Sequence, residues 1–138
     1  MRRILGISSI RSDYDLMSQV YKSLNEDPDV NFGILVSGAH LSHAYGNSVE
    51  LIRQDRLKII GEVETLINSD SNYSRLKTAS NFLSGSIDLI RMFDPDVIIF
   101  AGDREDVLFA GIIGGFLGIP TVHFFGGDHA IDGHIDNP

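Results

Sequence analysis

Short apolar runs alternate along this chain with longer segments of helical periodicity. The runs end in small or polar residues, which is the pattern of strands buried on both faces of a sheet. They predict strands over residues 3–8, 30–36, 57–63, 96–101 and 120–125. The segments between them predict helices between residues 12 and 27, over 48–54, over 72–93, and from the turn at 102–104 to 117. Strands that alternate with helices indicate an α/β fold with a parallel sheet.

Two of these helices show apolar positions at helical spacing. In the first, Ser12-Asp13 supply an N-terminal cap, and Leu16, Val20 and Leu24 follow at helical spacing. In the helix over 72–93, apolar positions step by three and four, which indicates an amphipathic stripe. Those positions are Leu76, Ala79, Leu83, Ile87 and Ile90. Asp94-Pro95 ends that helix.

The composition narrows the functions that such a fold can have. The chain has 138 residues, the length of one domain, of which 43% are hydrophobic and 22% charged. Eleven Lys and Arg against nineteen Asp and Glu leave a net charge of −8, which argues against nucleic acid or anionic membrane as a partner. There is no Cys, so disulfides and cysteine nucleophiles are excluded. With no signal peptide and no apolar window of membrane-spanning length, the sequence predicts a cytoplasmic protein.

Polar residues follow the apolar runs at 8–11, 37–43 and 103–104, and again from residue 126 onward. The carboxyl ends of parallel strands share one edge of a sheet, and ligands bind in the crevice outside that edge. We therefore expect these loops to gather around one site.

The Gly102-Asp103-Arg104 turn stands at the end of a predicted strand and opens a helix. Free backbone N–H groups and the helix dipole favour an anion there, and Arg104 could add a bidentate contact. Asp103 has two interpretations: a helix cap, or a carboxylate held beside a substrate. Arg11 follows the first strand, either as a solvated surface residue or, with Arg104, as a clamp for a diphosphate. Dinucleotide and Walker glycine patterns are absent from the loop around Arg11.

The tail over residues 123–138 holds three His and three Asp without a positive side chain. Imidazole and carboxylate together suit zinc or iron, although the spacing matches no standard ligand motif. The same groups also suit proton transfer. A glycine-rich surface loop is the third interpretation.

Several of these segments, taken in order, resemble the UDP-N-acetylglucosamine 2-epimerases, and among them the hydrolysing branch of the sialic-acid pathway. The resemblance runs almost end to end, and the common order of the motifs carries it. The motifs are Arg11-Ser12-Asp13-Tyr14; His40-Leu41-Ser42 with Gly46-Asn47-Ser48 and Asp55; Gly102-Asp103-Arg104; Ile119-Pro120 with His123; Gly126-Gly127; and Gly133-His134-Ile135-Asp136.

The resemblance implies the N-terminal half of a glycosyltransferase-B-type fold, in which two Rossmann-like domains hold a nucleotide sugar between them. Residues 1–138 would be the first domain, without the C-terminal nucleotide-binding domain, and inactive alone. The implied reaction removes the C2 proton of UDP-N-acetylglucosamine or a related UDP-2-acetamido sugar. Anti elimination of UDP and addition of water then give an N-acetylmannosamine-type sugar. Neither a cofactor nor a metal is implied.

The same resemblance implies roles for the loop residues. Asp103 and Asp136 match catalytic carboxylates of the family, and Asp128 is a further catalytic candidate. The substrate-binding candidates are Arg11, Arg104, His40, His123, Gly126 and Gly127.

Two departures from the family pattern bear on the substrate. Phe125 stands two residues after His123, where relatives commonly carry a glutamate, and a phenyl ring cannot move a proton. The usual Gly-Gly-Glu is Gly-Gly-Asp at 126–128, and the stretch from Asp128 to Asp136 is two residues longer. Either Asp128 or a tail histidine takes the missing role, or the substrate is another nucleotide sugar, such as a diacetylated bacillosamine derivative.

Other functions stay open beside this one. A stand-alone α/β nucleotide-sugar-binding or regulatory module suits the single-domain length, although receiver domains need acidic residues where this chain has Ser8-Ser9-Ile10-Arg11. A metal-dependent hydrolase would use the His/Asp tail. The helix over 72–93 is a candidate homodimer interface, but burial against the sheet explains its apolar stripe equally well.

Overall fold

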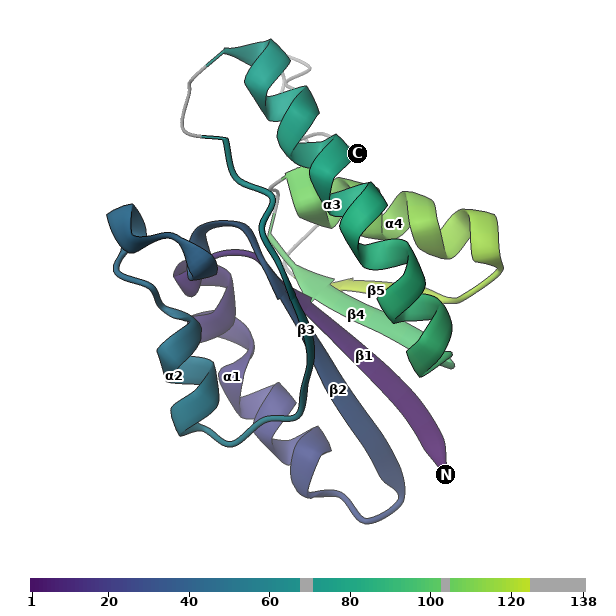
Figure 1. Ribbon diagram of the computed structural model, residues 1–138. Coiled ribbons are helices and arrows are strands. Elements are labelled where there is room, and N and C mark those ends of the chain that lie inside the picture. The colour runs from purple at the N-terminus through teal and green to yellow at the C-terminus, as the bar shows by residue number, and fades with distance from the viewer. Residues whose placement is uncertain (68–70, 103–104, 125–138) are drawn as a thin grey trace.

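A computed structural model describes residues 1–67, 71–102 and 105–124, and Figure 1 shows a sheet with helices on both sides. The strands are β1 (Arg2–Ser8), β2 (Val30–Ser37), β3 (Ile59–Val63), β4 (Val97–Ala101) and β5 (Thr121–Phe124). The α-helices are α1 (Arg11–Glu26), α2 (Val49–Gln54), α3 (Asn72–Phe93) and α4 (Glu105–Leu117). The 3-10 turns η1 (Gly38–Leu41) and η2 (His43–Tyr45) follow β2. Each predicted strand and helix is therefore present.

All strand pairs in the described part of the sheet are parallel, in the order β3-β2-β1-β4-β5. Strands β2 and β3 are added in turn on one side of β1. Helix α3 then connects β3 to β4 on the other side of β1, and β5 lies beyond β4 at that edge. This reversal between β1 and β4 is a topological switch point, where a crevice opens beyond the carboxyl ends of the strands. The predicted α/β fold is confirmed, and the strand order is Rossmann-like.

Helices α1 and α2 cover one face of the sheet, and α3 and α4 cover the other (Figure 1). Successive strand residues point to opposite faces, so the neighbours Ile34 and Leu35 belong to different cores. The α1/α2 core includes Tyr14, Met17, Tyr21, Phe32, Ile34, Val36, Val49, Ile52, Ile99 and Ala101. The α3/α4 core includes Leu5, Ile7, Leu35, Val63, Phe82, Ile90, Ile98, Phe100, Ala110 and Ile113.

Of the three apolar positions noted at helical spacing in α1, only Leu24 packs against the core. Leu16 and Val20 are 55% and 36% exposed, so they lie largely in solvent. The buried residues of the helix are Tyr14, Met17 and Tyr21. Tyr21 packs over Gly6 of β1, where a β-carbon would lie 2.8 Å from its ring. The glycine leaves room on the sheet for a large ring, and burial of aromatic rings outweighs burial of the aliphatic stripe beside them.

Helix α3 has the predicted bounds. The Ser71 hydroxyl caps its start by accepting a hydrogen bond of 3.1 Å from the Ser74 N–H. Asp94 ends it in the left-handed region, with φ of 53°, and its N–H donates to the Ile90 carbonyl. Neither α3 nor any other helix of the described residues combines the length and the apolar character that crossing a bilayer requires.

The buried stripe of α3 is shifted from the predicted one. Ala79 and Ile90 are buried and Leu83 packs against the core, but Leu76 and Ile87 are 64% and 41% exposed. The other buried residues of the helix are Thr78, Phe82 and Ser86. Gly85 lets the helix lie against β3, because a β-carbon there would stand 2.4 Å from the Val63 side chain, and the margins of the apolar face stay in solvent.

Candidate functional site

The loops that follow the strands meet at the carboxyl edge of the sheet (Figure 1). A backbone hydrogen bond of 3.3 Å from the His40 N–H to the Ser9 carbonyl joins the loop after β2 to the loop after β1. Of the predicted site residues, Arg11, His40 and His123 lie in the described part of the chain. The others, Asp103, Arg104, Gly126, Gly127, Asp128 and Asp136, lie outside the described residues, as does Phe125.

Arg11 is the first residue of α1, and it follows the last residue of β1, Ser8, by three positions. Its side chain is 65% exposed, and its Nε lies 3.5 Å from the Asp15 carboxylate one turn along the helix. An exposed pair of this kind contributes less than about 1 kcal/mol. The guanidinium can therefore exchange that partner for an anionic ligand at the edge of the sheet at little cost.

His40 is completely buried beneath this edge. Its Nε2 lies 2.7 Å from the Ser8 hydroxyl, and its Nδ1 lies 2.8 Å from the Ser48 hydroxyl. One ring nitrogen donates and the other accepts, and a serine hydroxyl can take either role. The imidazole thereby ties the end of β1 to the start of α2 and fixes the loop between them, with no ring surface exposed to a substrate in this conformation.

Burial lowers the pKa of His40 to about 4, although the nearby Asp15 charge opposes the shift. The ring is therefore neutral at physiological pH, and its two serine partners can satisfy one donor and one acceptor nitrogen. A neutral, enclosed imidazole is suited to positioning its neighbours. No pattern in the sequence indicates this burial, because the surrounding 37–47 segment has the composition of a polar loop.

Tyr14 packs its ring edge-on against His40, with ring centroids 6.1 Å apart. Its hydroxyl donates a hydrogen bond of 2.5 Å to the Asp55 carboxylate, and Lys22 lies 3.4 Å from the same carboxylate. Burial and the Asp55 charge both raise the pKa of Tyr14, so the phenol stays protonated as a donor. Tyr14 therefore packs against the His40 ring while Asp55 holds the Tyr14 hydroxyl in place. Both residues belong to motifs identified in the sequence.

Asp13 does not cap α1, because the N-cap residue is Ile10 and Asp13 lies inside the first turn. Its carboxylate instead lies against the α-carbon of Gly102, the residue that follows β4. A β-carbon at Gly102 would overlap the Asp13 carboxylate, and the backbone there has φ of 92°. Gly102 is therefore required both for its conformation and for this approach. The contact brings the start of α1 against the end of β4.

His123, on β5, contacts the backbone carbonyl of the same residue. Its Nε2 lies 2.5 Å from the Gly102 carbonyl oxygen, and its ring packs against Phe100 with centroids 5.0 Å apart. The carbonyl can only accept, so Nε2 carries the proton. His123 thus holds β5 to the end of β4, immediately before the turn that leads into α4.

Asp106 is a site residue that the sequence did not reveal. It lies in the first turn of α4, is 2% exposed, and accepts hydrogen bonds from the Ser37 hydroxyl at 2.6 Å and the Thr65 hydroxyl at 3.2 Å. The helix dipole favours a carboxylate at this end. Gly38, with φ of 61°, lets the chain pass close by, since a β-carbon there would lie 3.2 Å from the carboxylate. The only signal for Asp106 in the sequence is the acidic first turn of this helix. That signal does not show whether the carboxylate is buried or exposed.

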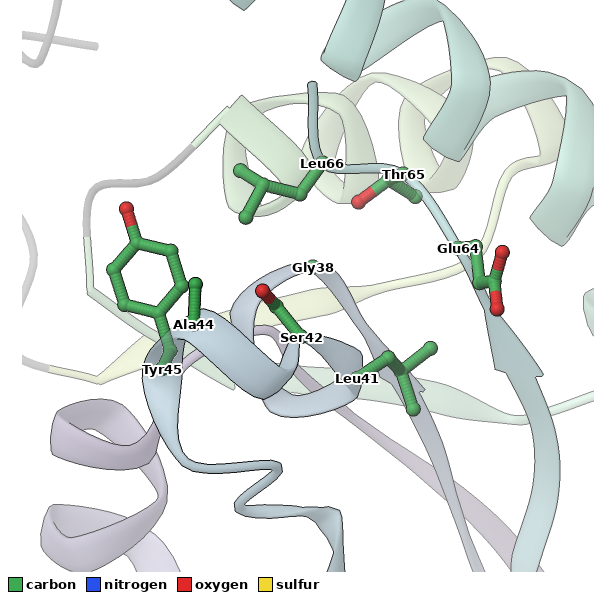
Figure 2. A pocket seen from close by; sticks show the side chains of 8 residues that line it. All are labelled: Gly38, Leu41, Ser42, Ala44, Tyr45, Glu64, Thr65 and Leu66. Carbon is green, nitrogen blue, oxygen red and sulfur yellow. The ribbon is translucent and has the colours of Figure 1, made fainter. Parts of the chain in front are cut away.

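A pocket of about 250 Å³ lies beside this cluster, between the η1–η2 loop and the segment that follows β3. Figure 2 shows Ser42, Ala44 and Tyr45 on the loop, facing Thr65 and Leu66 across the space. Its full lining is Gly38, Leu41, Ser42, Ala44, Tyr45, Glu64, Thr65 and Leu66. The pocket is therefore an indentation of mixed polarity at the carboxyl ends of β2 and β3.

The described residues hold no group of three or more His, Asp and Glu side chains that could bind a metal ion. The His/Asp tail that suggested such a site lies outside the described residues beyond His123. What the described edge offers is the exposed guanidinium of Arg11, at the first turn of α1, a group that can bind an anion in two-pronged geometry.

Comparison with known proteins agrees with this architecture. The family model described as UDP-N-acetylglucosamine 2-epimerase matches residues 22–137. The chain is 34% identical over 130 residues to the UDP-N,N'-diacetylbacillosamine 2-epimerase (hydrolyzing) of Legionella pneumophila, covering 94% of this chain and 34% of that protein. It is 29% identical over 131 residues to polysialic acid biosynthesis protein P7 of Escherichia coli, covering 95% of this chain and 34% of that protein. The chain spans about a third of the length of these relatives.

The fold is similar to the crystal structure of UDP-N-acetylglucosamine 2-epimerase from Neisseria meningitidis bound to UDP-N-acetylglucosamine. The TM-score is 0.75 at 18% identity, over 93% of this chain and 33% of that one. The described sheet thus corresponds to part of a glycosyltransferase-B-like architecture. Because the family model spans most of the sequence and the fold agrees with it, the chain belongs to the UDP-N-acetylglucosamine 2-epimerase family.

Proposed function

We propose that this chain is the N-terminal domain of a hydrolysing epimerase that converts a UDP-2-acetamido sugar into UDP and the C2-epimeric free sugar. In this proposal, a C-terminal domain supplies the remaining nucleotide contacts, and the 138 residues alone are inactive. The support is membership of the family, the name of the Legionella pneumophila relative, and the length of chain matched in each relative.

The observation that carries the proposal is the contact of Asp13 with Gly102. Asp13 lies two residues after Arg11, and Gly102 opens the turn that leads into α4. The contact therefore brings the Arg11 end of α1 and the start of the β4–α4 turn to one rim. A guanidinium and a helix N-terminus on one rim are what a sugar diphosphate needs for binding, even though the chain as a whole is acidic.

The proposed reaction needs acid–base groups at the sugar. One carboxylate takes the C2 proton, the C1–C2 double bond forms, and the C1–O bond breaks with its electron pair leaving on UDP. Water then adds its hydroxyl to C1, and a proton returns to C2 from the opposite face. Donor plus water thus gives UDP plus the epimeric free sugar. The groups proposed for proton transfer are Asp103, Asp128 and Asp136.

The other candidates are proposed as contacts or supports. Arg11, Arg104, Gly126 and Gly127 would bind the substrate, and His123 would hold the end of β4 beside it. His40 would act through Ser8 and Ser48, because both of its ring nitrogens already contact those hydroxyls.

The test is an assay of the complete protein with UDP-N-acetylglucosamine and a UDP-2,4-diacetamido sugar in deuterated water. We expect release of UDP and one deuterium at C2 of the sugar product. Asp103→Asn should lower turnover by about a hundredfold or more with an unchanged melting temperature. Asp88→Asn, on the exposed surface of α3, should leave turnover unchanged. Absence of UDP release from every 2-acetamido donor would refute the proposal, and binding without turnover would favour a regulatory module. Full activity of Asp103→Asn would make Asp103 a helix cap.

A further inference from the structure

A small cavity lies next to the pocket of Figure 2, and the two share Gly38 and Leu66 in their walls. Its volume is about 10 Å³. The lining comes from the loop after β1, from η1, from the segment after β3, from α3 and from the first turn of α4. A space of this size is about enough for one water molecule and leaves no room for a larger ligand.

The Ser9 hydroxyl is a buried polar group in the wall of this cavity. Ser9 is 3% exposed, and its buried Oγ has no hydrogen-bond partner among the described residues. The Ser9 carbonyl accepts from the His40 N–H at 3.3 Å, which fixes the backbone at this point. A hydroxyl that is withdrawn from bulk water without a partner is costly, and native proteins satisfy the great majority of such groups with protein or ordered water.

Three further polar side chains line the same cavity, those of Thr78, Glu105 and Asp106. Thr78 Oγ1 accepts from the Ile67 N–H at 3.2 Å and carries its own O–H donor. Asp106 accepts from two hydroxyls on one of its oxygens, and a carboxylate offers about four acceptor sites in all. Glu105 forms an ion pair with Arg75. The cavity therefore brings hydroxyl donors and carboxylate acceptors together.

One water molecule matches these groups in number and in kind. A buried water makes roughly two to four hydrogen bonds. In this cavity it can accept from the Ser9 and Thr78 hydroxyls and donate to the Asp106 and Glu105 carboxylates. An anion in the same place would be repelled by both carboxylates. Cavities that stay dry have apolar walls, which this one does not.

We propose that this cavity is the binding site of one structural water molecule, held by the Ser9 hydroxyl and the Asp106 carboxylate. Ser9 lies two residues before Arg11, so the water ties the loop that leads into α1 to the first turn of α4. It thereby adds to the contact of Asp13 with Gly102, which joins the same two regions. The site exists whether or not the edge of the sheet binds a UDP sugar.

The first experiment compares melting temperatures of the complete protein as wild type, Ser9→Ala and Ser86→Ala. Ser86 is the matched control, because its hydroxyl is also buried and without a partner among the described residues, yet it lies on α3 and does not line the cavity. We expect Ser9→Ala to melt about 2 °C lower or more, because the water loses a hydrogen bond.

Ser86→Ala should leave the melting temperature unchanged or raise it, because it removes an unpaired hydroxyl and alanine favours the helix. A melting temperature of Ser9→Ala equal to or above that of wild type would overturn the proposal, because the Ser9 hydroxyl would then be as unpaired as that of Ser86.

A crystal structure of the complete wild-type protein tests the site directly. We expect one density peak within about 2.5–3.2 Å of both the Ser9 Oγ and an Asp106 carboxylate oxygen. The lack of such a peak would overturn the proposal.

Exchange of sodium chloride for choline chloride in the melting experiments separates water from a sodium ion of similar size. We expect the difference between wild type and Ser9→Ala to be the same in both salts. A difference that shrinks in choline chloride would show that the cavity holds a cation, and the assignment of water would be wrong.

Discussion

The buried carboxylate of Asp106 accepts a 2.6 Å hydrogen bond from the hydroxyl of Ser37, a residue 69 positions earlier in the chain. The Thr65 hydroxyl reaches the same oxygen at 3.2 Å. Ser37 ends β2, Thr65 follows β3, and Asp106 begins α4, so one carboxylate joins three elements that surround the candidate site. This junction sets the geometry of the edge on which the proposed function depends.

Removal of the Asp106 carboxylate should destabilise the protein. Asp106→Ala leaves the Ser37 and Thr65 hydroxyls buried without their acceptor, and we expect the free energy of unfolding to fall by about 2–4 kcal/mol. Asp106→Asn keeps one acceptor oxygen and should lose about half as much. Denaturant unfolding of the purified variants measures both. Asp88→Ala, on the exposed surface of α3, is the control, and a loss in Asp106→Ala no larger than in that control would contradict the role assigned to the carboxylate.

Gly102 should tolerate no side chain. Gly102→Ala places a β-carbon on the Asp13 carboxylate and forces alanine to adopt φ of 92°, so we expect a loss of about 2–4 kcal/mol in unfolding free energy. The double variant Gly102→Ala/Asp13→Ala removes the overlap but not the backbone strain, and should recover part of the loss.

Gly115→Ala provides the matched control for this pair, because a β-carbon at Gly115 meets open space. Gly115 lies within α4, so alanine there should be neutral or stabilise by up to about 1 kcal/mol. Equal effects of the two glycine substitutions, or no recovery in the double variant, would show that the Asp13 contact is not tight.

The burial of His40 should make stability depend on pH. The folded-state pKa is about 4 against 6.5 for a free imidazole, so between these values the unfolded chain binds a proton that the folded one does not. The contribution of His40 is fully present above pH 6.5 and is lost as the pH falls towards 4. The total is about 3 kcal/mol.

Unfolding free energies measured from pH 7 to pH 4 test this dependence. His40→Gln, which does not titrate, should show a shallower fall than wild type, whatever its stability at pH 7. His43→Gln, at an exposed position, should retain the wild-type slope. Carboxylates titrate in the same window in all three proteins, so the difference in slope isolates His40. Identical slopes for wild type and His40→Gln would contradict the burial.

Arg11 should contribute to binding and not to stability. Arg11→Ala removes a guanidinium from the edge of the sheet, and we expect inhibition of the complete protein by UDP to weaken by about tenfold or more. The melting temperature should be unchanged, because the Arg11–Asp15 pair is exposed. Arg91→Ala, which removes an exposed charge from the far end of α3, should leave UDP inhibition unchanged. If the two variants bind UDP equally well, Arg11 lies outside the site.

Local patterns in the sequence were sufficient for the order and the ends of the elements. The bounds of α3 follow from its periodicity and from Asp94-Pro95, and each strand follows from an apolar run between turn residues. These signals depend only on residues that are close together in the chain, so they can be recognised from the sequence alone. The ordered loop motifs likewise resembled the UDP-N-acetylglucosamine 2-epimerases without any knowledge of contacts, and the acidic charge argued against nucleic acid and anionic membrane as partners.

The tertiary structure decided which side chains are buried and what they contact. Leu16 and Tyr21 both lie on α1, and the buried one is the tyrosine, because its ring packs where Gly6 leaves space on the sheet. His40 and Asp106 read as ordinary loop and helix-start residues until distant hydroxyls close around them. Periodicity is a property of neighbours along the chain, whereas burial depends on partners tens of residues away, and only the folded arrangement brings those partners together.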